Sequence, residues 1–290
     1  MSDGDLFRVP VGPGTLHVER YGFGGTPVLL IHGFATSSFL WRHVAPRLAT
    51  RQATAFAADL LGYGESDRPY TADFGVAAQA SYLDLALTAL RVTAATVVGV
   101  DVGATIALRL AFDRPERVQR LVLISPPSLN EFPPRELREL QRASGRYALS
   151  LNRSLLGAMP LFSEYLESLV GDRERMPPIL VGRYLAPFLG REGLAHLQTL
   201  VRSLEDDELD DLDPTEISQP ALILRGTRDR FCDRATAEGL ARALPNGRFA
   251  EAPEVGRLVP EERPDQLLDW ILASNPERHE SASPVVETTG

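Results

Sequence analysis

The sequence predicts an α/β fold whose central sheet is mostly parallel, with helices on both faces and a helical segment inserted before the last strands. Three observations predict it. Short, continuous apolar runs, which are typical of buried parallel strands, alternate with longer helical patterns. One long stretch in the second half of the chain has no strand pattern. The length of 290 residues fits a single domain or a core domain that carries an insertion.

The predicted elements follow from the residue pattern in chain order. Strand segments are short, apolar and bounded by glycine, proline or polar residues; they are Thr15–Tyr21, Pro27–Ile31, Thr54–Ala58, Thr96–Val100, Arg120–Ile124, Ala221–Arg225 and Arg248–Ala252. Helical segments repeat apolar residues three or four positions apart; they are Phe39–Ala49, Val76–Leu90, Ala104–Arg114, Ala235–Leu244 and Pro264–Leu272. Pro115 ends the third helix, because proline cannot continue one.

The stretch from residue 127 to residue 214 contains helical patterns and prolines but no convincing strand. We interpret it as a helical cap domain inserted between the two parts of a core domain, residues 1–126 and 215–274. The acidic run Glu205–Asp213 at its end is expected to be a solvated hinge face, since it lacks the spacing of a calcium loop. Residues 275–290 are polar and are predicted to be a disordered tail.

Composition excludes several classes of function. The net charge of −9 argues against a nucleic-acid or anionic-membrane partner. The chain has one cysteine, no apolar run of about 18 residues and no signal-peptide layout, so we expect a soluble cytoplasmic protein. It contains no nucleotide-binding or metal-binding motif, and we expect no cofactor and no metal. All 30 basic residues are arginine, which excludes lysine chemistry. The oligomeric state is left open.

The segment from Val97 to Ala111 carries the most information about chemistry. An apolar strand runs into Gly99, Asp101 and Gly103 at alternate positions and then directly into a helix. This is the strand–turn–helix pattern that presents a nucleophile at the top of a sheet, with Asp101 as the exposed side chain. Such a tight turn needs the two glycines. The helix N-terminus should also keep the Asp101 carboxylate ionised.

At this point the chain resembles the α/β-hydrolase superfamily over residues 15–273, in particular the epoxide hydrolases and haloalkane dehalogenases. Three further segments carry the resemblance: the apolar strand that ends in His32-Gly33-Phe34, the segment from Ser37 to Arg42, and the glycine-containing loop from Asp59 to Asp67. The cap would occupy the same position as in those enzymes. The resemblance implies that the backbone N–H groups of Phe34 and Val102 form an oxyanion hole.

The resemblance also implies a mechanism. In those families the aspartate attacks carbon and forms an alkyl ester, which a histidine-activated water hydrolyses while a second carboxylate orients the histidine. Asp229, after the strand Ala221–Arg225, occupies the position of that carboxylate. The family's histidine position is filled by Arg257, whereas Glu262 and Pro264 keep their expected offsets.

Arg257 cannot act as a general base, because a guanidinium stays protonated. It could pair with Asp101, whose pKa it would then lower, or with Asp229. Of the remaining histidines, His196 is the candidate for a relocated base, and His32 belongs to the loop beside the oxyanion hole. We predict that the substrate pocket is lined by His32, Trp41, Tyr147, Tyr184 and His196; Tyr165 is a further tyrosine of the cap, and Tyr184 is the best placed of the three.

These observations predict a non-hydrolytic enzyme that acts on an apolar small molecule. The predicted reaction is a cyclisation, an isomerisation or an elimination. Asp101 would be an acid/base or polar anchor, with Arg257 and the oxyanion-hole groups holding a developing anion. By analogy with other enzymes of this fold, the substrate is expected to be a natural-product intermediate. Two alternatives stay open: an epoxide hydrolase with a relocated base such as His196, and a catalytically inactive ligand-binding homologue.

Overall fold

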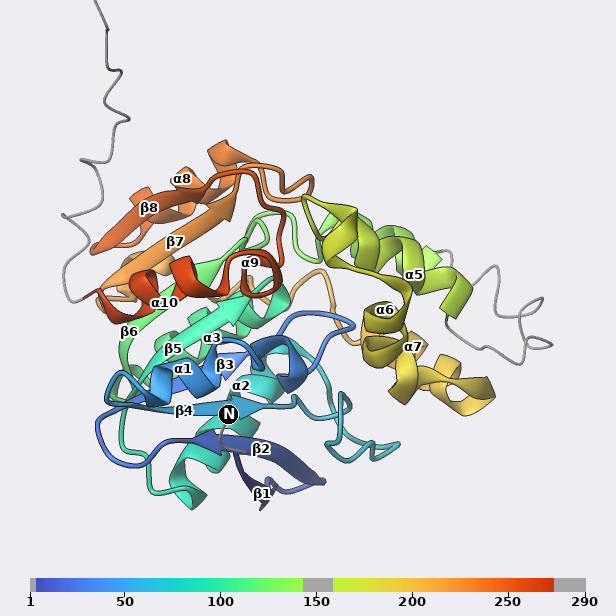
Figure 1. Cartoon of the computed structure of the whole chain (residues 1–290), viewed down its shortest axis with the longest axis horizontal. Coiled ribbons are helices and arrows are strands. Elements are labelled where there is room, and N and C mark those ends of the chain that lie inside the picture. Colours follow the sequence, from blue (N-terminus) through green and yellow to red (C-terminus); the bar gives the residue numbers. More distant parts are fainter. Residues whose placement is uncertain (1–3, 143–158, 274–290) are drawn as a thin grey trace, which may run out of the picture.

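The computed structural model describes residues 4–142 and 159–273, and it confirms the predicted α/β-hydrolase fold. The described residues form one eight-stranded sheet with the strand order β1-β2-β4-β3-β5-β6-β7-β8 (Figure 1). The strands are β1 (Asp5–Pro10), β2 (Thr15–Tyr21), β3 (Thr26–Ile31), β4 (Ala53–Ala58), β5 (Ala95–Val100), β6 (Val118–Ile124), β7 (Ala221–Gly226) and β8 (Gly247–Ala252). From β4 to β8 in this order, each strand is parallel to its neighbours. Strand β2 is antiparallel to both of its neighbours, β1 and β4.

The central strands are apolar throughout because both of their faces are covered. Every residue of β4 and of β5 is buried, as expected for strands between two layers of helices. One layer contains α1 (Ala45–Ala49) and α10 (Pro264–Leu272); the opposite layer contains α2 (Val76–Ala89), α3 (Val102–Asp113) and α8 (Arg234–Ala243) (Figure 1). The prediction of helices on both faces is therefore correct.

The N-terminal half of the core differs from the sequence prediction at β1 and after β3. Strand β1 was not predicted, because most of its side chains are exposed and it contains no continuous apolar run. The predicted helix Phe39–Ala49 is instead a 3₁₀ turn, Ser38–Trp41, followed by the short helix α1. Pro46 explains where α1 begins: it stands in the first turn, where a helix tolerates the missing N–H group.

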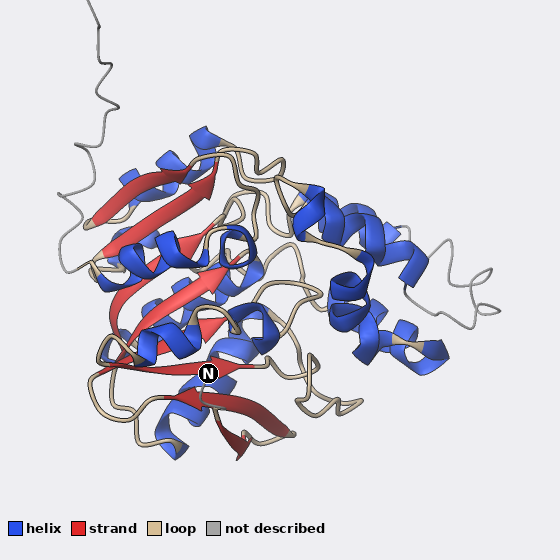
Figure 2. Ribbon diagram, in the orientation of Figure 1, coloured by secondary structure: helices blue, strands red, loops and turns tan. Residues whose placement is uncertain are grey.

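Between β6 and β7 the described residues form helices and turns but no strand (Figure 2). These helices are α5 (Met159–Ser168), α6 (Pro178–Leu185) and α7 (Gly190–Arg202), and residues 135–142 are also helical. They lie beyond the carboxyl ends of the parallel strands (Figure 1). We call residues 127–214 the cap, following the predicted division. The predicted tail 275–290 lies outside the described residues.

Across residues 4–142 and 159–273, every helix is too short or too polar to span a lipid bilayer.

Candidate active site

Asp101 lies between β5 and α3 in a strained backbone conformation. Its φ and ψ angles are 56° and −128°, a region that residues with side chains rarely occupy. The turn is closed by the N–H of Ala104, which donates to the carbonyl oxygen of Asp101 at 2.9 Å. A Cβ atom at Gly99 would lie 2.2 Å from the carbonyl oxygen of Gly103, and one at Gly103 would lie 2.3 Å from that of His32. The turn therefore requires both glycines.

The Asp101 carboxylate is held by the groups that were predicted to form an oxyanion hole. The N–H of Phe34 donates to its Oδ2 atom at 3.1 Å, and the N–H of Val102 also donates to this carboxylate. Gly33 allows this approach, since a Cβ atom there would lie 2.8 Å from that of Asp101. In this structure the two N–H groups therefore bind the carboxylate itself.

Arg257 pairs with Asp101, which answers the question that the sequence left open. Its Nη1 atom donates to Oδ1 of Asp101 at 2.6 Å. Asp229 is farther away: its Oδ2 atom is 3.5 Å from Nε of Arg257 and makes no hydrogen bond with it. The guanidinium also lies over the ring of Phe231, at 4.9 Å from the ring centre. Asp229 is oriented instead by backbone N–H groups of Phe231 and Cys232, which donate to its Oδ1 atom at 2.8 and 3.3 Å.

Glu136 is a third carboxylate at this guanidinium, and the sequence did not point to it. Its Oε1 atom lies 2.8 Å from Nη1 of Arg257, the same nitrogen that binds Asp101. Glu136 belongs to the helical residues 135–142 at the start of the cap. No sequence signal separates it from Glu139 on the same helical segment, because both are acids beside core-facing leucines. We call Asp101, Glu136, Asp229 and Arg257 the buried charge cluster.

Burial controls the ionisation of this cluster. Arg257 is 0% exposed and Asp101 is 1% exposed. Burial raises the pKa of Asp101 above its ordinary value, and this effect outweighs the Arg257 guanidinium and the Phe34 N–H, which lower the pKa. The expected lowering of the Asp101 pKa by Arg257 is therefore wrong in its net direction, because desolvation of the carboxylate is the larger effect. Burial likewise raises the pKa of Glu136.

The loop that carries Arg257 is fixed by contacts with the cap. The backbone N–H groups of Arg257 and Leu258 both donate to the carbonyl oxygen of Leu169, at 2.7 and 3.1 Å. The carboxylate of Glu262 accepts hydrogen bonds from Gly171 and Asp172 of the cap and from Gly256 beside Arg257. Glu262 lies on α9 (Val259–Glu262). The position of Arg257 therefore depends on how the cap sits on the core.

Tyr165, on α5, is the cap tyrosine that faces the buried charge cluster. It is 7% exposed, and its hydroxyl has no hydrogen-bond partner within residues 4–142 and 159–273. Burial raises the pKa of this hydroxyl, and the charges of Asp101, Arg257 and Glu136 also influence it. Its ring packs edge-on against Phe34. Tyr184 was predicted to be the better placed tyrosine, but its hydroxyl donates to Glu261 and its ring packs on Phe39. Tyr147 lies outside the described residues.

His32 and Trp41 are buried in the core. The N–H of Leu60 donates to Nε2 of His32 at 3.0 Å, and Nδ1 contacts the carbonyl oxygen of Gly33 at 2.8 Å. These two contacts define a neutral tautomer with no nitrogen left for base catalysis, and burial lowers the pKa of His32. Trp41 is fully buried, and its indole nitrogen has no hydrogen-bond partner.

His196 lies in a different environment from Asp101. Its Nε2 atom contacts the carbonyl oxygen of Gly62 at 2.8 Å, and its ring stacks on Phe188. It lines a cavity of about 450 Å³ together with Arg68, Phe74 and Thr199. The groups that shift its pKa include no member of the buried charge cluster. The structure therefore does not bring His196 together with Asp101 as a relocated base.

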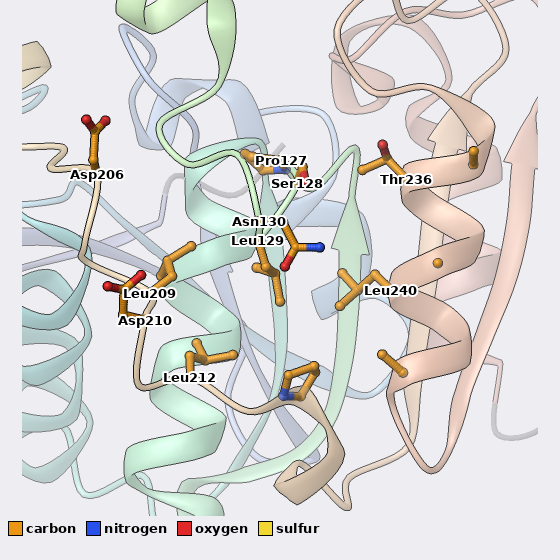
Figure 3. A pocket seen from close by; sticks show the side chains of 14 residues that line it. Pro127, Ser128, Leu129, Asn130, Asp206, Leu209, Asp210, Leu212, Thr236 and Leu240 are labelled. Carbon is orange, nitrogen blue, oxygen red and sulfur yellow. The ribbon is translucent and has the colours of Figure 1, made fainter.

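A larger cavity, of about 720 Å³, lies where the chain passes between core and cap (Figure 3). It is lined by residues 127–130 after β6, by residues 206–214 before β7 and by one side of α8. Figure 3 shows Leu129, Leu209, Leu212 and Leu240 around it. Neither this cavity nor the one at His196 is lined by a member of the buried charge cluster.

Comparison with known proteins identifies the family. Residues 26–264 match the family described as alpha/beta hydrolase fold. The curated relatives that match at 32% identity are matched over about half of their own length; one of them is a haloalkane dehalogenase of Agrobacterium fabrum, aligned over 54% of this chain and 53% of its own. A cis-3-alkyl-4-alkyloxetan-2-one decarboxylase of Xanthomonas campestris is 26% identical over 92% of this chain and 94% of its own.

Solved structures agree with the fold. An alpha/beta hydrolase fold protein from Burkholderia ambifaria superposes with a TM-score of 0.81 and 24% sequence identity, covering 94% of this chain and 98% of that one.

Proposed function

Because the chain belongs to the alpha/beta hydrolase fold family, we propose that it is an enzyme of this fold that transforms an apolar small molecule without hydrolysing it. The reaction would be an isomerisation, cyclisation or elimination. One observation carries the proposal: Arg257 is hydrogen-bonded to Asp101 at 2.6 Å in a site that is sealed from solvent. In our interpretation Arg257 stands where the related hydrolases have their catalytic histidine.

This pairing opposes hydrolysis at the step after nucleophilic attack. An alkyl ester on Asp101 needs a base that activates water, and a guanidinium cannot provide one. Although burial opposes the charged form of Arg257, the surrounding carboxylates raise its pKa well above the ordinary value. Among the histidines in the described part of the chain, His32 has both ring nitrogens engaged and His196 lies elsewhere.

The site offers hydrogen-bond donors to a substrate oxygen. The Nη2 atom of Arg257 and the hydroxyl of Tyr165 are buried and have no hydrogen-bond partner among the residues that the structure describes. A buried donor without an acceptor costs about 1–3 kcal/mol, so a ligand that supplies the acceptor gains affinity. Aromatic rings surround these donors, since Tyr165 packs against Phe34 and Phe231. We therefore propose a substrate with an apolar body and a carbonyl, ring or hydroxyl oxygen. The proposed reaction requires no metal or cofactor.

A relative supports this substrate class and a reaction other than hydrolysis. The Xanthomonas campestris protein is named for the decarboxylation of an alkyl-substituted oxetan-2-one, a four-membered lactone with a ring oxygen and a carbonyl oxygen. The haloalkane dehalogenase relative instead favours the alternative of a hydrolase.

Product analysis with three variants tests the proposal. The parent protein, Arg257→His, Asp101→Asn and the control Arg263→His, which changes an exposed arginine nearby, are incubated with panels of epoxides, haloalkanes and esters. Mass spectrometry separates hydrolysis, which adds one water, from isomerisation, which leaves the mass unchanged. We expect no hydrolysis by the parent or the control, and hydrolysis by Arg257→His that disappears when Asp101→Asn is added.

The same experiment separates the alternatives. Robust hydrolysis by the parent would overturn the proposal in favour of a conventional hydrolase. A parent that neither converts nor binds any compound of the panels would support the inactive homologue. With a reactive epoxide we expect a persistent adduct that maps to Asp101, because nothing releases the ester; a parent that turns this epoxide over to the diol contradicts that expectation.

A further inference from the structure

The three carboxylates of the buried charge cluster outnumber its single cation. Arg257 is 0% exposed, Asp101 1%, Asp229 7% and Glu136 9%. If all three acids were ionised, the cluster would carry two uncompensated negative charges away from water. Uncompensated buried charge is so costly that a group binds a proton instead. The cluster therefore holds at least one carboxylic acid in its neutral form.

Hydrogen bonding indicates which acid this is. Two backbone N–H groups donate to Asp229. Asp101 accepts from the N–H groups of Phe34 and Val102 and from Nη1 of Arg257. Donors of this kind stabilise the ionised form of a carboxylate.

Glu136 has less of that support. Its Oε1 atom lies 2.8 Å from Nη1 of Arg257, which lowers the pKa of this acid, but burial raises the pKa by more. Among the described residues, no backbone N–H group of another residue donates to its carboxylate, in contrast to Asp101 and Asp229. Of the three acids, Glu136 is therefore the one least stabilised as an anion.

We propose that Glu136 is the proton-holding acid of this site and that it supplies the proton for the reaction. Its Oε1 atom and Oδ1 of Asp101 both contact Nη1 of Arg257, so the acid and the carboxylate meet at one nitrogen. In this arrangement Asp101 stays ionised and paired with Arg257.

The proton step balances without a further reactant. The O–H bond of Glu136 breaks while the proton bonds to a substrate oxygen or to an unsaturated carbon, which supplies the electron pair. Asp101 stabilises the positive charge that develops on the substrate. A proton lost from a neighbouring substrate carbon in the last step returns to the Glu136 carboxylate. The substrate is isomerised or cyclised, and the protein ends in its starting state.

The role of Glu136 as an acid in the reaction rests on the proposed function, but its protonation does not. The protonation can be measured in the full-length protein without a substrate. Glutamate labelled with ¹³C at the side-chain carboxyl carbon is incorporated, and the carboxyl resonances are followed by NMR from pH 4 to pH 9. The Glu136→Gln variant identifies the Glu136 resonance. Glu139→Gln is the control, because Glu139 is exposed on the same helical segment and pairs with Arg135.

We expect the Glu136 resonance to have the chemical shift of a neutral acid at pH 7 and to titrate at a higher pH than Glu139. A Glu136 resonance that is ionised at pH 7 and titrates with the exposed glutamates overturns the proposal.

Thermal unfolding gives a second, independent readout. Glutamine resembles the neutral acid, so Glu136→Gln should be as stable as the parent at pH 7 or more stable. If Glu136 is instead an ionised partner of Arg257, the variant loses stability at pH 7, and the proposal fails. A Glu136→Gln variant that does not fold counts against the proposal in the same way. Conversion of the panels by Glu136→Gln at the parental rate would refute the catalytic role of Glu136 alone.

Discussion

Arg257 places one positive charge opposite three carboxylates in a region sealed from solvent. A buried ion pair is weak evidence for stability, but removal of one partner leaves the other charge uncompensated. The chain therefore depends on this guanidinium even though an arginine is costly to bury. In the proposed function the same charge also leaves Asp101 without a conventional base, so one residue would affect both stability and chemistry.

Replacement of Arg257 by methionine tests the dependence on this charge. We expect a loss of unfolding free energy of about 3–5 kcal/mol at pH 7, since the ionised carboxylates of the buried charge cluster lose the cation that compensates them. The pKa values of Asp101 and Glu136 are already raised by burial, and loss of Arg257 raises them further. Carboxyl groups with a raised pKa in the folded state favour folding at low pH, and this stability is lost as the pH rises through the raised values.

Chemical denaturation of the methionine variant between pH 5 and pH 8 is the measurement. The difference in unfolding free energy between the parent and this variant should become smaller toward pH 5, because the carboxyl groups bind protons there. A loss that is independent of pH would show that packing of the arginine side chain, and not its charge, is what stabilises the fold.

The strand, turn and helix around Asp101 form the element on which the site is built. Strand β5 and helix α3 approach so closely that no side chain fits at Gly99 or Gly103. We expect Gly99→Ala and Gly103→Ala each to lower the unfolding free energy by more than about 3 kcal/mol, because backbone atoms would have to shift.

Gly239→Ala is a suitable control, since no atom lies within 4 Å of a Cβ at this position of α8. The unfolding free energy of this variant should be higher than that of the parent by about 0.5–1 kcal/mol, because alanine is the better helix former. Thermal unfolding of the three variants checks both signs. Parental stability of Gly99→Ala would contradict the close approach of β5 and α3.

At the scale of the whole molecule, two consecutive glutamates of α9 connect the core with the cap. Glu262 accepts N–H groups from Gly171 and Asp172 of the cap and from Gly256. Glu261 accepts the hydroxyl of Tyr184 and pairs with Arg42 of the core. Because Asp101 is 1% exposed, the proposed substrate would reach it only when this closed arrangement opens.

Glu262→Gln should make that opening more frequent. We expect the unfolding free energy to fall by about 1.5–3 kcal/mol, which is the contribution of hydrogen bonds to a charged acceptor. Hydrogen exchange of the Arg257 and Leu258 amides, which donate to Leu169 of the cap, should be faster than in the parent. Glu254→Gln is the control, because Glu254 is exposed and pairs only with Arg228 on the surface. Unchanged exchange at both amides in Glu262→Gln would show that Glu262 does not hold the cap closed.

Much of the fold and part of the site could be predicted from local pattern. The elbow at Asp101, the strand before Asp229 and the helical character of the cap each depend on neighbouring residues in the sequence. Strand β1 escaped prediction because its exposed side chains leave no apolar run. Tyr165 and Glu136 could not be singled out from the sequence, because the residues around them do not distinguish them from Tyr184 and Glu139.

Local patterns in the chain were enough to predict the fold and the presence of Arg257 after the last strand, because hydrophobic periodicity, glycine at tight turns and residue chemistry are local properties. The folded structure was needed to show that Arg257 binds Asp101 rather than Asp229, that Glu136 contacts the same nitrogen, and that burial raises the pKa of Asp101. Contacts between residues more than 100 positions apart, and the desolvation that accompanies them, arise only when the cap and the core close over the site.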